Sequence, residues 1–176
     1  MSRLPRKFVF EPHEVGVYHG INRCVRQSML CGWDPFTQRS CEHRKRWLQQ
    51  RLLFLGSVMA IEIEGFCNMA NHLHLMVRSR PGVAANWSAA EIARKWLQLC
   101  PPYKPGTREV AETPSQADLD APLINPGWVE QLRLWLSKHS WLMRCLTESL
   151  ARFANREDLT TGRFWGGAIQ DAAAAR

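Results

Sequence analysis

Alternating hydrophobic and polar residues predict three β-strands in the first half of the chain. Segments 15–25, 60–66 and 72–77 place apolar side chains at every second position, which is the period of a strand with one buried face. Residues 68–71, between the last two segments, are of the kind that forms turns. We therefore expect the second and third strands to form a hairpin.

Helical periodicity marks three other segments. Ser40 is expected to cap a first helix with Glu42 in its first turn. Ser88 and Glu91 form the capping-box pattern of a second helix. In 128–155 the apolar residues fall on one side at about 100° per residue, so we expect one long amphipathic helix there.

This order of elements indicates the fold class and a single domain. The elements follow one another as strand, helix, strand, strand and helix, with the additional amphipathic helix. This is the pattern of a ferredoxin-like split βαβ sandwich, an α+β fold with an antiparallel sheet and helices packed on one face. A length of 176 residues fits one domain. We expect a basic arm over 1–14, a domain over 15–165 with a loop at 26–38 and a long Pro-rich insertion at 101–127, and an irregular Ala-rich tail over 166–176.

Charge and aromatic content favour a nucleic-acid partner without establishing one. The chain has 23 Lys and Arg against 16 Asp and Glu, a net charge of +7, and it contains 8 Trp. Arginine pairs with phosphates and aromatic rings stack on bases. A basic, solvated surface over a Trp-rich core explains the same composition equally well.

Other compositional features exclude some classes of protein. No apolar run reaches the ~20 residues of a membrane span, so we expect no membrane contact. The basic N-terminus is not followed by an apolar signal core, which predicts a cytoplasmic protein. The 6 Cys form no CxxC pair, and we expect free, mostly buried thiols.

The candidate chemistry lies in His72 and His74. Residues two apart on a strand point to the same face, roughly 7 Å apart along it, so both imidazoles can converge on one divalent metal. Two histidines on one strand are more often incidental, and the spacing alone leaves both interpretations open.

Several segments together resemble one known family. Residues 63–77, which contain Asn-His-Leu-His-Leu-Met-Val, resemble the signature of the HUH single-tyrosine transposases, whose His-hydrophobic-His motif supplies two metal ligands. Residues 18–23, Tyr-His-Gly-Ile-Asn-Arg, resemble the first strand of that superfamily. Segments 140–146, 151–158 and 161–165 resemble its REP-associated branch.

The resemblance implies a function, a cofactor and a set of contact residues. Such proteins bind single-stranded or hairpin DNA and cleave and rejoin strands in DNA transposition, using Mg²⁺ or Mn²⁺ and a phosphotyrosine intermediate. His72 and His74 would bind the metal, and the chain could act as a homodimer. The residues expected to contact nucleic acid, from the matched segments and the polar side of the predicted long helix, are Arg23, Trp141, Arg144, Arg152, Arg156 and Arg163.

The sequence departs from the family at the nucleophile. The chain has 2 Tyr, and neither matches the family's nucleophile, which follows the segment ending at Trp165. Tyr18 lies in the first predicted strand, where a structural role is the better interpretation, and Tyr103 lies in the Pro-rich insertion. We therefore predict no catalytic residue, interpret the chain as a C-terminally truncated or frame-shifted copy, and expect the third metal ligand to be lost with the nucleophile.

Two binding alternatives follow from that absence. An intact transposase domain would cut DNA, whereas a non-catalytic remnant would use the same surface only to bind it. The missing Tyr favours the remnant.

Two hydrolytic alternatives remain open. A phosphodiesterase using His72 and His74 as acid and base generally needs a second strand motif containing His, and none is found, because His139 lies in a helix and His13 in the arm. A metal-dependent hydrolase of the zinc type needs a third ligand, for which the nearby candidates are Glu62, Glu64 and Cys67.

Overall fold

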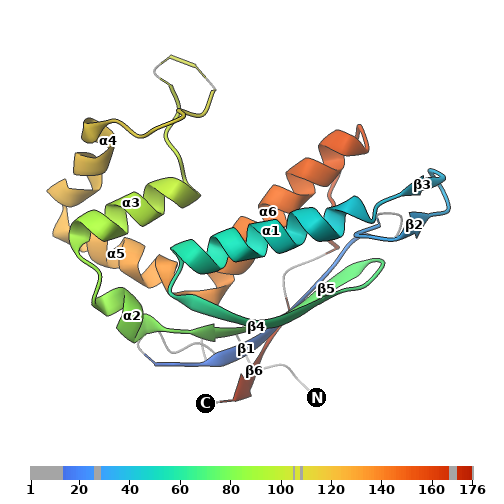
Figure 1. Ribbon diagram of the computed structural model, residues 1–176, viewed down its shortest axis with the longest axis horizontal. Helices are drawn as coiled ribbons and strands as arrows, with labels where there is room; N and C mark the ends of the chain where they lie inside the picture. The colour runs from blue at the N-terminus through green and yellow to red at the C-terminus, as the bar shows by residue number, and fades with distance from the viewer. Residues whose placement is uncertain (1–13, 26–28, 105, 108, 167–169, 176) are drawn as a thin grey trace.

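The protein has an α+β fold in which helices cover one side of an antiparallel sheet (Figure 1). The computed structural model describes residues 14–25, 29–104, 106–107, 109–166 and 170–175. The predicted basic arm therefore lies outside the described residues, apart from Glu14.

The main sheet confirms the three predicted strands and adds a fourth. Its order is β4-β5-β1-β6, and every neighbouring pair is antiparallel. The strands are β1 (Val17–Arg23), β4 (Ile61–Asn68), β5 (His72–Ser79) and β6 (Gln170–Ala175). The prediction of an irregular tail over 166–176 is therefore wrong for the residues in β6. This strand forms backbone pairs along the edge of β1, and a search for apolar alternation does not detect such pairing.

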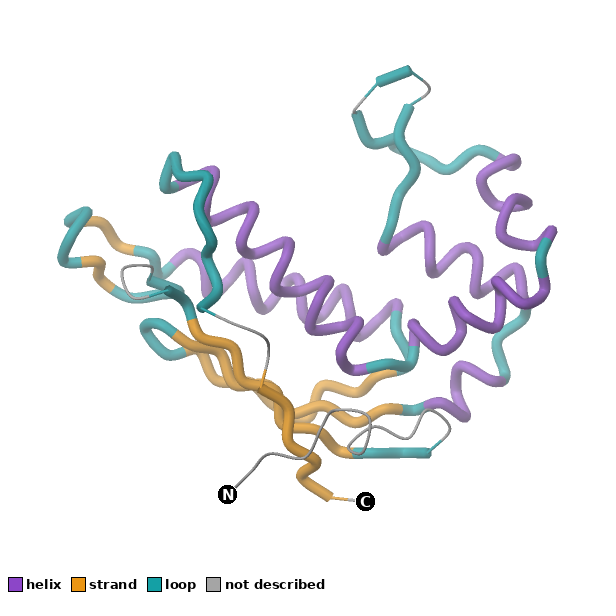
Figure 2. The backbone as a smooth tube through the Cα atoms, turned by 180° about the vertical axis from the view of Figure 1, so that it is seen from behind, coloured by secondary structure: helices purple, strands orange, loops and turns teal. Residues whose placement is uncertain are grey.

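Two long helices, α1 (His43–Val58) and α6 (His139–Glu157), lie across one face of the sheet, as seen from both sides in Figures 1 and 2. That face supplies Tyr18, Leu73, Leu75 and Val77 to the core, and each of these side chains is at most 3% exposed. The alternate residues of β1 and β5 are only half-buried. One face of the sheet therefore packs into the core, and the described helices do not cover the other.

Shorter elements surround this two-layer body. A small hairpin pairs β2, which lies inside the predicted loop over 26–38, with β3, which directly follows that loop; residues 26–28 lie outside the described part. The predicted capping box is confirmed at the start of α3, where the Ser88 hydroxyl accepts from the Glu91 backbone N–H. The bounds of the remaining elements are β2 (Trp33–Asp34), β3 (Arg39–Ser40), α2 (Pro81–Ala85), α3 (Ala89–Leu99), α4 (Gln116–Asp120), η2 (Ala121–Ile124) and α5 (Pro126–Leu136).

The helix expected over 128–155 is two helices, α5 and α6, separated at Ser137 and Lys138. The Ser137 hydroxyl lies within hydrogen-bond distance of the carbonyl oxygens of Arg133 and Leu134. A hydroxyl that bonds to the preceding turn competes with continued helix formation. The apolar period runs through the break because both helices bury their apolar side in the same core.

Two other boundaries also differ from the predictions. Ser40 belongs to β3, and α1 begins after Glu42, which makes no side-chain cap. The Pro-rich insertion contains α4 and η2, where Ser115 and Asp118 form a second capping box. Its few apolar residues gave no helical period, although the cap residues were visible in the sequence.

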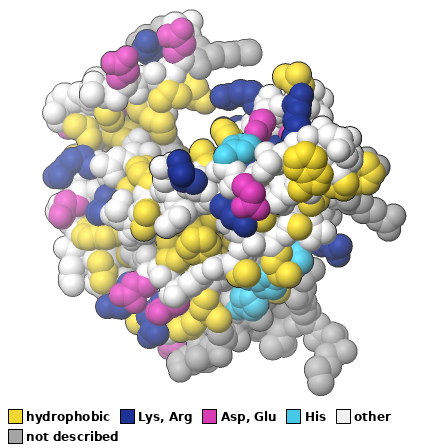
Figure 3. All heavy atoms as spheres, turned by 45° about the vertical axis from the view of Figure 1, so that its right-hand side comes forward, with side chains coloured by type: hydrophobic (Ala, Val, Ile, Leu, Met, Phe, Trp, Pro, Cys, Tyr) yellow, Lys and Arg dark blue, Asp and Glu magenta, His cyan; other side chains and the backbone are white. Residues whose placement is uncertain are grey.

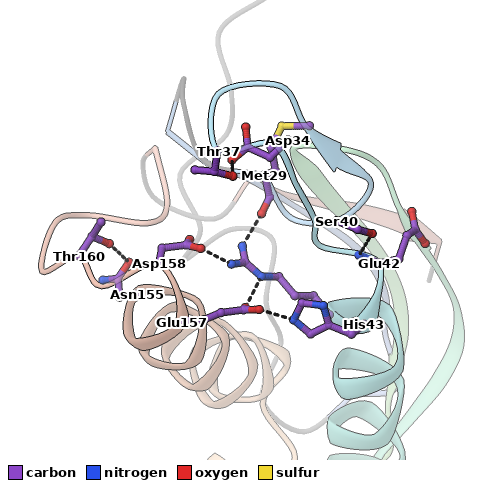
Figure 4. A network of polar contacts seen from close by, with 11 residues as sticks. Met29, Asp34, Thr37, Ser40, Glu42, His43, Asn155, Glu157, Asp158 and Thr160 are labelled. Carbon is purple, nitrogen blue, oxygen red and sulfur yellow. Dashed lines mark hydrogen bonds and ion pairs between the residues drawn. The ribbon is translucent and has the colours of Figure 1, made fainter.

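Arg44 links the start of α1 to the end of α6 by ion pairs. Its partners Glu157 and Asp158 are labelled in Figure 4. Its side chain is 1% exposed, and it donates to Glu157 at 2.8 Å, to Asp158 at 2.6 Å and to the Met29 carbonyl at 2.7 Å. Hydrogen bonds to the two carboxylates raise the pKa of Arg44 against the opposing effect of burial, which is the largest single influence. A buried guanidinium with its charge compensated in this way is a structural element.

In the part of the chain that the structure describes, no helix has the length and apolar character needed to span a membrane.

Candidate nucleic-acid and metal interface

His72 and His74 lie side by side on the sheet face that the helices leave uncovered. Their ring centroids are 5.1 Å apart, and both side chains are half-buried. The alternate residues Leu73 and Leu75 are 0% and 1% exposed, so this side of the strand faces the core and the histidines lie on the opposite side. The prediction that both imidazoles leave the same face is confirmed, and Figure 3 shows histidine side chains gathered at the surface.

The structure adds a third histidine that the sequence reasoning missed as a site residue. His19 of β1 places its Nε2 3.1 Å from Nδ1 of His74, and the two rings stack at 5.2 Å. The alternation in 15–25 already placed His19 on the same strand face as Ile21 and Arg23. The missing information was the pairing of β1 with β5, in which Ile21 is opposite His74.

Asn71 orients the ring of His72. The Asn71 Oδ1 lies 2.6 Å from the Nδ1 of His72. Since an amide oxygen only accepts, the contact requires the proton on Nδ1 and leaves the lone pair on Nε2. This is the arrangement by which an outer partner prepares a histidine for metal binding.

The two carboxylates proposed to complete a hydrolytic metal site are engaged in ion pairs with arginines. Glu64 accepts from Arg78 at 2.6 Å, and Glu62 pairs with Arg80 at 2.5 Å. Cys67 is opposite His74 in the sheet and exposed. Within the described ranges, no three or more His, Cys, Asp and Glu side chains are grouped so as to hold a metal ion. The histidine pair therefore fits a cation only if other ligands, such as phosphate oxygens or water, complete the coordination.

Two of the predicted DNA-contacting arginines lie at the histidine end of the sheet. Arg23 is exposed and opposite His72 in the β1–β5 register. The segment containing Arg163 reaches the same end, because Trp165 forms a bridge with Cys24 and the Gly166 N–H donates to the Arg23 carbonyl. These contacts bring two basic segments of the chain to the end of the sheet that carries the histidines.

The other predicted contacts lie on α6, on the opposite side of the sheet from the histidines. Arg144 and Arg152 are exposed and both pair with Glu148, at 3.3 Å and 2.9 Å. Arg156 is exposed near the end of the same helix. The predicted nucleic-acid residues therefore form two separate groups rather than one face.

Trp141 is part of an aromatic cluster on the helical side. Its ring stacks on Trp135 at 4.7 Å and on Trp96 at 5.6 Å, and the Arg144 guanidinium lies 4.9 Å over it. Its buried Nε1 has no hydrogen-bond partner among the described residues. Any base that stacked on this ring would have to compete with the contacts already present.

Neither tyrosine lies at the histidine face. Tyr18 is 3% exposed and stacks on His139 at 4.2 Å, which confirms its structural role. Tyr103 is exposed and pairs with Val110 in the segment between α3 and α4. Figures 1 and 2 both show that segment at the far side of the molecule from the turn between β4 and β5.

The cysteines are free thiols, as predicted, but only half of them, Cys24, Cys31 and Cys41, are buried. Burial raises the pKa of Cys24 to about 12 and that of Cys145 to about 11. These two thiols are therefore protonated and uncharged near neutral pH.

Comparison with known proteins assigns no family: no protein-family model matches the chain, and no curated protein matches it.

Proposed function

We propose that this protein binds single-stranded or hairpin DNA in the manner of the HUH single-tyrosine transposases, and that His72 and His74 hold Mg²⁺ or Mn²⁺ against the DNA. The observation that carries the proposal is the pair of adjacent imidazoles on the uncovered sheet face, with Arg23 opposite His72. A phosphodiester would supply the oxygen ligands that this pair lacks and would pair with the nearby guanidinium.

The chain's own residues would have distinct tasks at such a site. Asn71 holds His72 with its Nε2 lone pair free, and His19 limits the rotation of His74. Arg23 and Arg163 would bind neighbouring phosphates. A bound divalent cation would polarise the phosphodiester that it contacts.

We further propose that the chain binds DNA without cleaving it. Strand cleavage of this type needs a hydroxyl positioned for attack on the phosphate. Tyr18 is enclosed in the core and Tyr103 is remote from the histidines, which supports binding without a covalent step.

We further infer a ferredoxin-like architecture for this protein, and the order of its strands supports this. β5 lies between β1 and β4, and α1 connects those two strands, as in a split βαβ unit.

The test is a fluorescence-anisotropy titration with a labelled DNA hairpin and a matched unpaired strand. We expect affinity to fall steeply as salt rises, because Arg side chains displace phosphate counterions. Arg23→Ala should weaken binding by about 1–3 kcal/mol if its hydrogen bond to phosphate is charge-assisted. Arg94→Ala, an exposed cation on α3, is the control for loss of one charge. Binding that is independent of salt and of Arg23 would refute the proposal.

The contact between His19 and His74 favours a second candidate, metal-independent phosphodiester hydrolysis. Two imidazoles 3.1 Å apart can serve as an acid and a base, and they come from two strands, the feature that the sequence alone did not reveal. Hydrolysis of a 2′,3′-cyclic nucleotide in excess chelator that is lost in His19→Gln would support it. No turnover under those conditions would exclude it.

A further inference from the structure

The groove between α1 and α6, on the side of the helices away from the histidines, contains an unusual cation. The groove contains a hollow of about 380 Å³, which is lined by Trp47, Gln50, Arg51, Phe54 and Ser149. The Arg51 Nε is buried and has no hydrogen-bond partner among the described residues. Buried donors in folded proteins are almost always paired, so an unpaired one at the wall of a hollow indicates a missing partner.

Among the described residues, no carboxylate is paired with Arg51. Burial lowers the pKa of its guanidinium, and the described groups that oppose this effect are the thiols of Cys145 and Cys100. Burial also raises the pKa of both thiols, so they are uncharged near neutral pH. Glu148, on the adjoining helix, already pairs with Arg144 and Arg152.

Aromatic rings flank this guanidinium. Arg51 lies 5.0 Å over the Phe54 ring, and Trp47, one helical turn earlier, stacks on Phe153 of α6 at 5.3 Å. The rings of Trp47 and Phe54 also line the hollow. A guanidinium with no anion among the described residues, in a hollow also lined by two aromatic rings, matches a phosphate joined to a flat, stacking group.

We propose that the groove between α1 and α6 binds one unpaired nucleotide, with Arg51 paired to its phosphate and Trp47 and Phe54 in contact with its base. The exposed Arg144 and Arg152 on the neighbouring surface of α6 would bind phosphates on either side of it. The identity of the ligand as part of a DNA strand rests on the proposed function, whereas the recognition of a nucleotide phosphate does not.

The test compares three probes on the full chain: a labelled unpaired oligonucleotide, adenosine monophosphate and inorganic phosphate. Arg51→Gln removes the charge at the groove, and Arg46→Gln removes the same charge from an exposed position of α1 outside the hollow. We expect Arg51→Gln to weaken oligonucleotide binding about tenfold or more, as for loss of a charge-assisted hydrogen bond, and Arg46→Gln to weaken it no more than about twofold.

The outcomes separate this proposal from the proposed function. If the oligonucleotide binds and Arg51→Gln binds it equally well, the groove proposal is overturned and DNA binding stands. If only adenosine monophosphate binds, and does so through Arg51, the groove takes free nucleotides and DNA binding is refuted. If no probe binds, both proposals fail. Should Arg51→Gln not fold, Trp47→Leu provides a second comparison, because it removes an aromatic ring from the hollow and keeps the guanidinium.

Discussion

Arg44 and Arg51 lie on the same helix, seven residues apart, yet their surroundings differ in one decisive respect. Arg44 is buried at the end of α6 with Glu157, Asp158 and a carbonyl oxygen as partners. Arg51 lies farther along α1 beside the same α6, and among the described residues its Nε is unpaired and no carboxylate is its partner. The protein itself neutralises the first cation, and for the second we propose an external partner. Burial of a charge therefore indicates a binding site only when its partners are missing.

The largest effect should come from removing the compensated cation. Arg44→Ala leaves Glu157 and Asp158 without their common partner, and breaking such a buried network costs about 3 kcal/mol of unfolding free energy. Urea denaturation measures this value. Arg46→Ala, an exposed neighbour on α1, should change it by no more than about 0.5 kcal/mol. Equal losses for the two variants would show that Arg44 does not fasten the helices.

The unfolding free energy should depend on pH through Cys145, a thiol close to Arg51. Because burial raises the pKa of Cys145 from 9.0 to about 11, its contribution to stability is fully present below the ordinary thiol pKa and is lost as pH rises from there through about 11. The unfolding free energy of the wild-type protein should therefore decline above pH ~9, and Cys145→Ala should decline less steeply. Chemical denaturation between neutral and alkaline pH gives the slope. Identical slopes would mean that Cys145 ionises as easily in the folded chain as in the unfolded one.

The smallest effect on stability is expected at Arg51. Arg51→Gln removes a half-buried charge that has no partner, so the unfolding free energy should remain within about 1 kcal/mol of wild type or increase. The urea experiment that measures Arg44→Ala measures this variant too. A loss as large as that of Arg44→Ala would place Arg51 among the structural residues and remove the contrast.

The sequence predicted the elements of the site better than their connections. Period-two alternation identified β1, β4 and β5 and placed His72 and His74 on one face, because each strand has one buried side. It could not reveal that His19 meets His74, since strand pairing is a long-range property. The break between α5 and α6 was also missed, because both helices share one apolar core and only the Ser137 hydroxyl marks the junction.

The predicted DNA-contacting residues illustrate the same limit. Arg144 and Arg152 were correctly placed on an exposed helix side, but periodicity does not say which layer of the fold that side belongs to. Nothing in the sequence distinguishes Arg51 from the other cations of its helix, because an unpaired donor is visible only when its neighbours are known.

The central claim is that DNA and a divalent cation meet at His72 and His74. Electron paramagnetic resonance of free Mn²⁺ tests it directly, with and without an unpaired oligonucleotide at constant salt. Two bound ligands change each other's affinity by the same factor, and a phosphate oxygen that completes the coordination of the cation makes this change favourable. We predict that the oligonucleotide increases Mn²⁺ affinity, and that His72→Ala and His74→Ala abolish this increase while His43→Ala, an exposed histidine on α1, preserves it. An affinity for Mn²⁺ that changes neither on addition of DNA nor on substitution of the two histidines would contradict the account.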